Sequence, residues 1–225
     1  LFIRARREDK APLLELFASG TSNMSGIVFD PGRVKLDKEL RDVVLKRYLE
    51  AVLDPKTQQL GTPYGFTKTH ATLPWGVGAP HQPTDFAGPA GGRRISALAD
   101  FVLTNRFTAV LAPTHLIRDH EDPWFATDVE SVLKLRRELD KRRGSKIAIF
   151  YELAIPYAVF RDSSERKLIA RALSGLPIDQ LWIKVDGLGS GSTASGIGNY
   201  LDACSDFHVL ERPLIADHFG GYAGL

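Results

Sequence analysis

Short apolar runs recur along the chain, and nearly every one of them ends in a polar or charged residue. Apolar runs of this length, bounded by turn-forming residues, are typical of strands that are buried on both faces. The pattern predicts strands at 26–30, 51–54, 107–112, 146–152, 181–185 and 213–218.

Segments with apolar residues three and four positions apart separate these strands and predict amphipathic helices. The predicted helices are 11–18, 36–49, 93–105, 125–142 and 163–173, and the same spacing opens again at Ile197, Tyr200 and Leu201. Strands that alternate with helices predict an α/β fold with a parallel sheet covered on both sides.

Such a sheet can close in two ways, as a TIM-type (β/α)8 barrel or as an open doubly wound sheet. We prefer the barrel, because all strand ends of a barrel converge on one mouth, whereas an open sheet uses mainly its switch point. Six predicted units are too few to close a barrel, so we expect an incomplete one in a single domain over 1–225. We also expect that residues are missing from at least one end.

Residues 55–92 break the repeat, because they are rich in proline and glycine and show no sustained periodicity. Long loops inside compact domains are usually functional or disordered. The aromatic residues Tyr64, Phe66, Trp75 and Phe86 argue against disorder, since they offer apolar surface for burial. We expect a long loop that either covers a substrate or packs structurally.

Composition narrows the class of protein. Hydrophobic residues make up 44% and charged residues 25% of the 225 residues, and the formal net charge is +2. These values are ordinary for a globular protein and give no general case for binding nucleic acid. The lone Cys204 excludes an internal disulfide, and no apolar run is long enough for a membrane span. We therefore expect a cytoplasmic protein without a membrane partner.

Basic residues at the N-terminus, Arg4, Arg6 and Arg7, could contact phosphates. We favour a solvated, half-ordered terminus, because chain ends are usually poorly ordered. The helix at 125–142 carries basic and acidic residues together, so it predicts a solvated face and not a nucleic-acid surface.

The polar strand ends are the candidate active site, because catalytic residues of parallel α/β folds lie at the carboxyl ends of strands. We interpret Asp30 and Asp54 mainly as turn caps, since both precede prolines. The candidate catalytic residues follow three successive strands and are Glu152, Lys184, Asp186, Asp217 and His218.

Lys184 and Asp186 are two positions apart and therefore point to the same face of their strand. They could form an interior ion pair, or they could act in catalysis. The catalytic alternatives are acid–base or Schiff-base chemistry by Lys184, and carboxylate ligation of a divalent metal. His115 is a candidate for substrate binding, and a turn cap is the alternative.

A glycine-rich turn follows the strand at 181–185, and three interpretations stay open. Its candidate substrate-binding residues are Gly187, Gly189, Gly191, Ser192 and Thr193. Backbone N–H groups and hydroxyls at a helix N-terminus could cradle a phosphate or another anion. Gly189, Gly191 and Ala194 also fit a loose dinucleotide fingerprint, and a merely flexible loop is the third interpretation.

These patterns favour an enzyme, a hydrolase, lyase or transferase, that acts on a small anionic substrate, and phosphorylated substrates are included. The alternative is a non-catalytic binding or assembly module, which includes a nucleic-acid-associated one. Convergence of the five candidate catalytic residues in one pocket would favour the enzyme.

Overall fold

Seven parallel strands form one sheet in the computed structural model, which describes residues 1–20, 23–186 and 194–217. Their order in space is their order in the sequence, and every neighbouring pair is parallel. The strands are β1 (Phe2–Arg4), β2 (Gly26–Phe29), β3 (Glu50–Leu53), β4 (Ala109–Leu111), β5 (Ala148–Pro156), β6 (Gln180–Asp186) and β7 (Leu214–Ala216).

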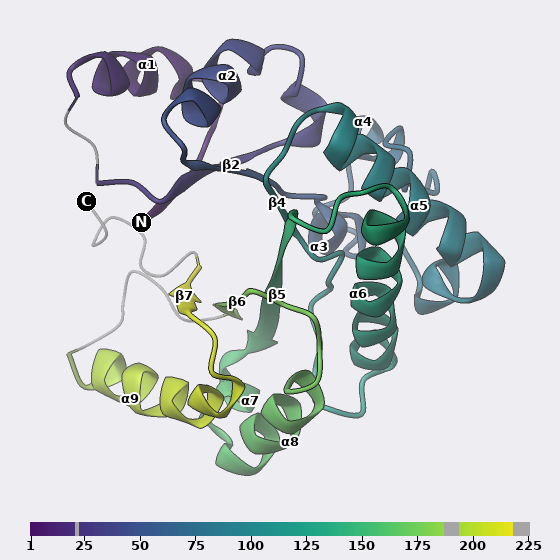
Figure 1. Ribbon diagram of the computed structural model, residues 1–225. Coiled ribbons are helices and arrows are strands. Elements are labelled where there is room, and N and C mark those ends of the chain that lie inside the picture. The colour runs from purple at the N-terminus through teal and green to yellow at the C-terminus, as the bar shows by residue number, and fades with distance from the viewer. Residues whose placement is uncertain (21–22, 187–193, 218–225) are drawn as a thin grey trace.

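The sheet curls into a half-barrel with helices around its outside (Figure 1). An open doubly wound sheet reverses its strand order at a switch point, and this sheet does not. The predicted incomplete (β/α) barrel is therefore confirmed. The sequence pattern missed β1, because three residues are too short a run to stand out.

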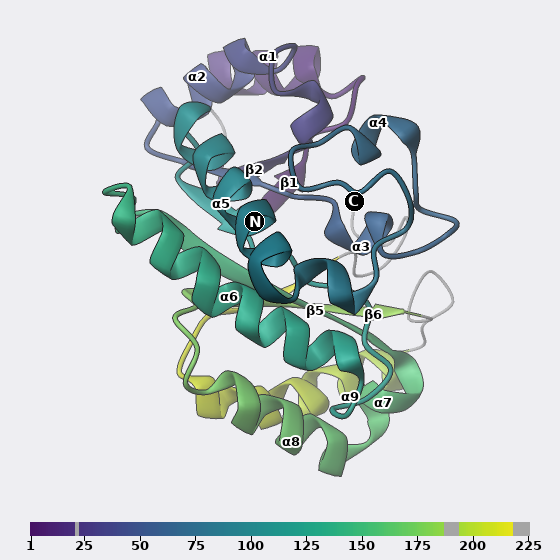
Figure 2. The ribbon, with the colours of Figure 1, turned by 90° about the vertical axis from the view of Figure 1, so that its right-hand side faces the viewer.

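Helices connect successive strands. The longer ones are α1 (Lys10–Ala18), α2 (Lys38–Lys46), α5 (Gly88–Thr104), α6 (Pro123–Lys141), α8 (Ser163–Leu173) and α9 (Ala194–Ser205). Figure 2 shows α5 and α6 side by side, with α6 in front of β5. Within the described ranges, no helix combines the length and the apolar character needed to cross a membrane.

Shorter elements fill the remaining connections. They are α3 (Thr57–Leu60), α4 (Lys68–Ala71), α7 (Tyr157–Arg161) and the 3-10 turns η1 (Pro31–Arg33), η2 (Pro83–Phe86) and η3 (Asp206–Leu210). Three of them, α3, α4 and η2, lie in the segment 55–92 that we expected to be a loop. Trp75 and Phe86 anchor this segment in the core, and the Trp75 indole donates to the Pro55 carbonyl at 2.8 Å. Structural packing is thus one of its roles.

The inner face of the curled sheet has an apolar layer. Strand side chains alternate between the two faces, so every second residue points inward. The inner layer contains Phe2, Val28, Val52, Ala109, Leu111, Phe150, Trp182 and Ile215. The intervening residues, such as Ile27, Leu53 and Ile149, pack under the helices instead.

A polar layer lies directly above this apolar one. Six polar residues each follow an inner apolar residue by two positions, and they are Arg4, Asp30, Asp54, Glu152, Lys184 and Asp217. Because the strands are parallel, this alternation aims the side chains toward the same, carboxyl-terminal end of the half-barrel.

Candidate functional site

Arg4 lies at the centre of the polar layer and contacts three carboxylates, those of Asp54 after β3, Glu152 within β5 and Asp217 after β7. The predicted strand end at Glu152 is wrong, because β5 continues to Pro156. Arg4 Nη1 is 2.5 Å from Asp54 Oδ2, and Arg4 Nη2 is 2.8 Å from Glu152 Oε1. Asp217 binds Arg4 in a bidentate manner, with Nε to Oδ1 at 3.2 Å and Nη2 to Oδ2 at 2.6 Å. We call these four residues the Arg4 cluster.

The expectation of a solvated terminus is wrong for Arg4. Pairing of β1 with β2 brings Arg4 opposite Val28 and directs its side chain inward. Arg6 and Arg7, beyond the strand, are exposed as expected. The signal that could have identified Arg4 is its position two residues after Phe2, the same apolar–polar spacing that marks the other strand ends.

Arg4 remains a cation in this setting. Burial by itself lowers the pKa of the guanidinium, but the charges of Asp54, Glu152 and Asp217 outweigh it and raise the pKa further above its ordinary value. The carboxylates are almost fully buried, with relative exposures of 6%, 5% and 8% for Asp54, Glu152 and Asp217. A permanent positive charge is therefore enclosed by three buried acids.

Glu152 differs from the other acids in its proton affinity. Burial raises the pKa of the Glu152 carboxyl well above its ordinary value, and a hydrogen bond with Asp217 and the charges of Asp217 and Asp54 raise it further. Arg4 opposes this shift without cancelling it. A carboxyl that keeps its proton in a buried mouth can act as a general acid.

Asp54 shows the opposite behaviour. Burial would raise the pKa of its carboxyl, but the charges of Lys56 and Arg4 and the Lys56 backbone N–H lower it to about 2. The Lys56 ammonium is 3.0 Å from Asp54 Oδ2. Two acids of one cluster thus have pKa values that are pushed apart, which is a pattern of acid–base sites.

Asp30 and Asp54 also cap turns, as predicted. Asp30 Oδ1 accepts from the Gly32 N–H at 2.7 Å, and Asp54 Oδ1 accepts from the Lys56 N–H at 2.8 Å. Asp30 Oδ2 lies 3.7 Å from His70 Nε2 and 3.8 Å from Lys56 Nζ. The segment 55–92 therefore contributes two basic side chains, Lys56 and His70, to the mouth. Neither was among the predicted site residues.

Lys184 and Asp186 do not pair with each other. The Lys184 ammonium is half-buried and donates to Gln58 Oε1 at 2.9 Å, while Asp186 is exposed at the end of β6. The interior ion pair considered from the sequence is therefore wrong. Among the residues that the structure describes, Lys184 has no carboxylate within ion-pair distance.

His115 is held away from the Arg4 cluster. Its Nδ1 is 2.8 Å from Asp128 Oδ1, and its backbone N–H donates to Asp128 Oδ2 at 2.7 Å. Its ring stacks on Trp124 with centroids 3.5 Å apart. The turn-cap interpretation is wrong, because Asp128 on α6 and not a local turn binds His115.

The remaining candidates lie outside the described residues. They are His218 and the glycine-turn residues Gly187, Gly189, Gly191, Ser192 and Thr193. Glu152 and Asp217 are thus the two predicted catalytic residues that the structure brings into contact with one partner, Arg4.

Metal ligation has little support in this part of the mouth. No group of three or more His, Cys, Asp or Glu residues in the described ranges is arranged to hold a metal ion. The guanidinium of Arg4 occupies the position between the carboxylates and neutralises part of their charge. The donor set therefore suits an internal arginine better than a divalent cation.

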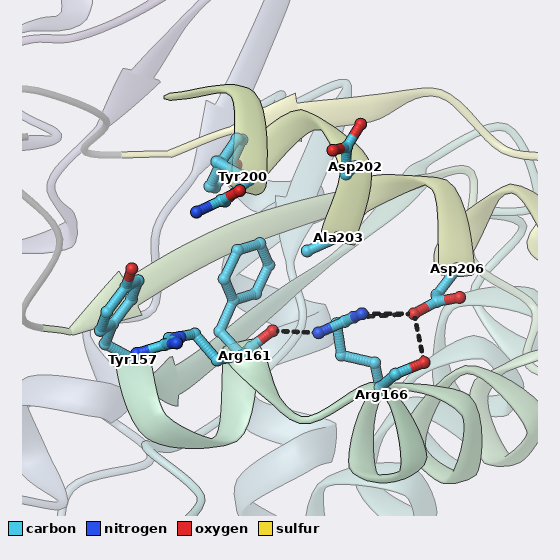
Figure 3. A pocket seen from close by; sticks show the side chains of 10 residues that line it. Tyr157, Arg161, Arg166, Tyr200, Asp202, Ala203 and Asp206 are labelled. Atoms are coloured by element: carbon cyan, nitrogen blue, oxygen red, sulfur yellow. Dashed lines mark hydrogen bonds and ion pairs between the residues drawn. The ribbon is translucent and has the colours of Figure 1, made fainter. Parts of the chain in front are cut away.

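A separate cavity of about 340 Å³ lies between α7, α8 and α9 (Figure 3). Tyr157 and Arg161 line it on one side and Tyr200 on the other. Arg166 closes one end by donating to Asp206 Oδ2 at 2.8 Å and to the Phe160 carbonyl. None of the Arg4 cluster lines this cavity, so we do not place the reaction there.

No protein-family model matches the sequence, and no curated protein matches it significantly. Solved structures do resemble it. Xylanase10C from Cellvibrio japonicus, in complex with xylopentaose, aligns with a TM-score of 0.51 and 9% identity over 95% of this chain and 46% of that one. The GH26 beta-mannanase BoMan26A from Bacteroides ovatus aligns with a TM-score of 0.50 and 13% identity, over 96% of this chain and 70% of that one.

A putative deoxyribose-phosphate aldolase from Coccidioides immitis aligns with a TM-score of 0.49 and 10% identity over 99% of this chain and 79% of that one. This chain spans about half the length of the xylanase chain. At such identities the xylanase and mannanase likenesses support the fold alone. Together with the strand order, they define an incomplete (β/α) barrel.

Proposed function

We propose that this protein is a barrel enzyme whose acid–base site is the Arg4 cluster. The observation that carries the proposal is the convergence of three buried acids on one arginine, with Asp54, Glu152 and Asp217 at 2.5, 2.8 and 2.6 Å from its nitrogens. Glu152 has a raised pKa and Asp54 a lowered one, although both touch the same guanidinium. A buried acid with a raised pKa beside an ionised one is an arrangement that general acid catalysis uses.

In this proposal Glu152 donates a proton to the reacting group of the substrate, and Asp217 serves as the adjacent base. Both carboxyls bind Nη2 of Arg4, and they hydrogen bond to each other. Arg4 fixes their positions, and Asp54 stays ionised and contributes a constant negative charge beside them. Buried, preorganised charges of this kind stabilise charge that develops in a transition state.

The substrate in this proposal is a small anionic molecule, and phosphorylated compounds are included. Lys184 supports this choice. Its ammonium has three N–H donors, and among the described residues it donates to the neutral side-chain amide of Gln58. Lys184 therefore keeps N–H groups for a substrate anion. Asp186, His218, His115 and the glycine-turn residues remain proposed contributors, and the reaction is a hydrolysis, elimination or group transfer by acid–base chemistry.

A thermal-shift screen of small phosphates and carboxylates, each beside its uncharged analogue, tests the anion site. We expect an anionic compound to raise the melting temperature, and we expect Lys184→Gln to abolish that shift. Lys167→Gln is the matched control, because Lys167 is exposed on α8 and should leave the shift unchanged. Equal stabilisation by charged and uncharged analogues would contradict an anionic substrate.

Turnover of the stabilising compound, followed by NMR, tests the acid. Glu152→Gln should keep the thermal shift and slow turnover by roughly 100-fold or more, because the amide has no acidic proton. Binding without turnover by the unmodified protein would instead favour the binding module. Turnover by Glu152→Gln at the normal rate would remove Glu152 from the mechanism.

A further inference from the structure

Lys56 has a backbone conformation that its place in the chain does not explain. Its φ of 61° and ψ of 20° lie in the left-handed region, which few residues other than glycine and asparagine adopt. The other described residues that have a positive φ without being glycine all follow a helix or a 3-10 turn, and they are Tyr48, Arg106, Arg143 and Glu211. Left-handed residues commonly end helices, whereas Lys56 precedes α3.

Lysine is also an unusual residue at the start of a helix. The position directly before a helix favours Ser, Thr, Asp and Asn, because their side chains accept the first free N–H groups. The Lys56 side chain makes no such hydrogen bond with α3. Asparagine would suit both the left-handed backbone and the helix start. The local structure therefore gives no reason for lysine at this position, and we look for the reason in the contacts of its ammonium.

Both polar groups of Lys56 contact the same acid. The Lys56 backbone N–H donates to Asp54 Oδ1 at 2.8 Å, and Lys56 Nζ lies 3.0 Å from Asp54 Oδ2. Each oxygen of this carboxylate therefore has a donor from Lys56. Nζ also lies 3.8 Å from Oδ2 of Asp30, which follows the neighbouring strand β2. Lys56 thus fixes the carboxylate that ends β3 and reaches the one that ends β2.

Asp54 passes this constraint on to Arg4. Asp54 Oδ2 accepts from Arg4 Nη1 at 2.5 Å. The other nitrogens of the same guanidinium bind Glu152 and Asp217. A guanidinium is planar and rigid, so an anchor at Nη1 also sets the directions of Nη2 and Nε. Burial raises the pKa of the Asp54 carboxyl, but the charge of Lys56, followed by that of Arg4, lowers it to about 2, so the anchor stays ionised.

We propose that Lys56 is a positioning residue of the acid–base site, which acts through Asp54 to hold Arg4 against Glu152 and Asp217. The inference rests on the function proposed above and adds to that site a residue of the segment 55–92. The ion pairs of Lys56 are with Asp54 and Asp30, so it places other groups and does not itself exchange the proton.

NMR of the intact chain tests this role without a substrate, with carbon-13 in the aspartate carboxyls and nitrogen-15 in the arginines. Lys56→Asn tolerates the left-handed backbone and keeps the N–H to Asp54, but it removes the ammonium. We expect the acid dissociation constant of Asp54 to fall roughly tenfold, because a carboxylate that loses an adjacent cation holds its proton more tightly. The Arg4 Nε–H should exchange with water roughly tenfold faster, because its anchor is weakened.

Two further variants complete the experiment. Lys56→Arg restores a cation and should return both values toward those of the unmodified protein. Lys68→Asn is the matched control, because Lys68 is exposed on α4 in the same segment, and it should change neither value. A lysine with a merely structural role would leave the titration of Asp54 unchanged in Lys56→Asn.

An unchanged Asp54 titration in Lys56→Asn would therefore overturn the proposal, as would equal changes in Lys68→Asn. Circular dichroism of Lys56→Asn confirms that the fold is retained, and Lys56→Gly, which also suits the left-handed backbone, should give the same two changes. Failure of the proposed function would appear in the turnover test of Glu152→Gln, whereas failure of this inference would appear in the NMR titration.

Discussion

At the scale of single residues, the Arg4 guanidinium compensates the buried charges of Asp54 and Asp217 and also binds Glu152, although these residues lie far apart in the sequence. Breaking a buried pair by removing one partner is strongly destabilising, because it leaves uncompensated charge in a poorly solvated place. When Arg4 is removed, the free energy of unfolding must therefore depend on the protonation of the remaining acids and so on pH.

Arg4→Met tests this dependence. We expect it to lower the free energy of unfolding at pH 7 by about 3–5 kcal/mol, because the buried carboxylates of the cluster lose their counter-ion. Acidification should recover part of the loss as the carboxyls become protonated. Urea unfolding at pH 7 and pH 4 measures both effects, with Arg6→Met as the exposed control. A pH-independent loss would indicate that only packing had changed.

His81 provides a second test by pH. Burial, followed by the nearby His115, lowers its pKa from 6.5 to about 4. The unfolded chain therefore binds more protons between these values, and His81 makes the unfolding free energy fall as the pH decreases from 6.5 to 4. The full effect is about 3 kcal/mol.

His81→Phe removes this titration and keeps a ring against Phe86. Stability measured from pH 7 to pH 4 should decrease less in the variant than in the unmodified protein. His208→Phe, at an exposed position, is the control. Parallel profiles for His81→Phe and the unmodified protein would show that His81 does not titrate in this range.

At the scale of elements, strand alternation produces the site. Six of the inner apolar residues are followed two positions later by a polar one, so the apolar layer supports the polar layer. The sequence pattern predicted the helix at 163–173 with its observed bounds, but began α5 at residue 93 when it begins at Gly88. Pro89 explains the difference. Proline in a sequence usually indicates the end of a helix, but it is also favoured in the first helical turn.

Close packing of β2 against β3 gives a prediction for one strand. Gly26 lies opposite Glu50, and a Cβ on Gly26 would lie 2.4 Å from the Glu50 carbonyl oxygen. Gly26→Ala should therefore destabilise the protein by about 3 kcal/mol, since the backbone of β3 must move.

Gly92→Ala is the matched control. A Cβ at Gly92 in α5 meets no described atom within 4 Å, so alanine should stabilise the helix by about 0.5–1 kcal/mol. Thermal unfolding of both variants measures the pair. Equal effects of the two substitutions would contradict the close approach at Gly26.

At the scale of the whole molecule, the first and last strands meet through side chains across the open side of the half-barrel. Arg4 on β1 binds Asp217 after β7, and Phe2 contacts Trp182 on β6 with ring centroids 4.9 Å apart. These contacts hold together β1 and β7, the two edge strands of the sheet, which do not pair with each other within the described ranges.

Asp217→Asn should loosen both edges together. We expect amide hydrogen exchange in β1 and β7 to become roughly tenfold faster, while β4 in the middle of the sheet keeps its protection. Asp202→Asn, at an exposed position on α9, is the control. Faster exchange in β7 alone would show that Asp217 does not connect the two edges.

The sequence by itself determined the order of strands and helices, the parallel sheet and the polar character of the strand ends. Apolar periodicity reports local burial, so it can give these features without tertiary information. It also identified Glu152 and Asp217, because both come directly after apolar runs.

Only the tertiary structure decided which polar residues meet. Curling of the sheet brings Arg4 to Asp217, 213 positions away, and places Lys56 beside Asp54. Lys184 reaches Gln58 and not Asp186, and His115 binds Asp128 of α6. Side-chain partners and pKa values depend on distances through space and on burial, and residue spacing along a chain does not specify either.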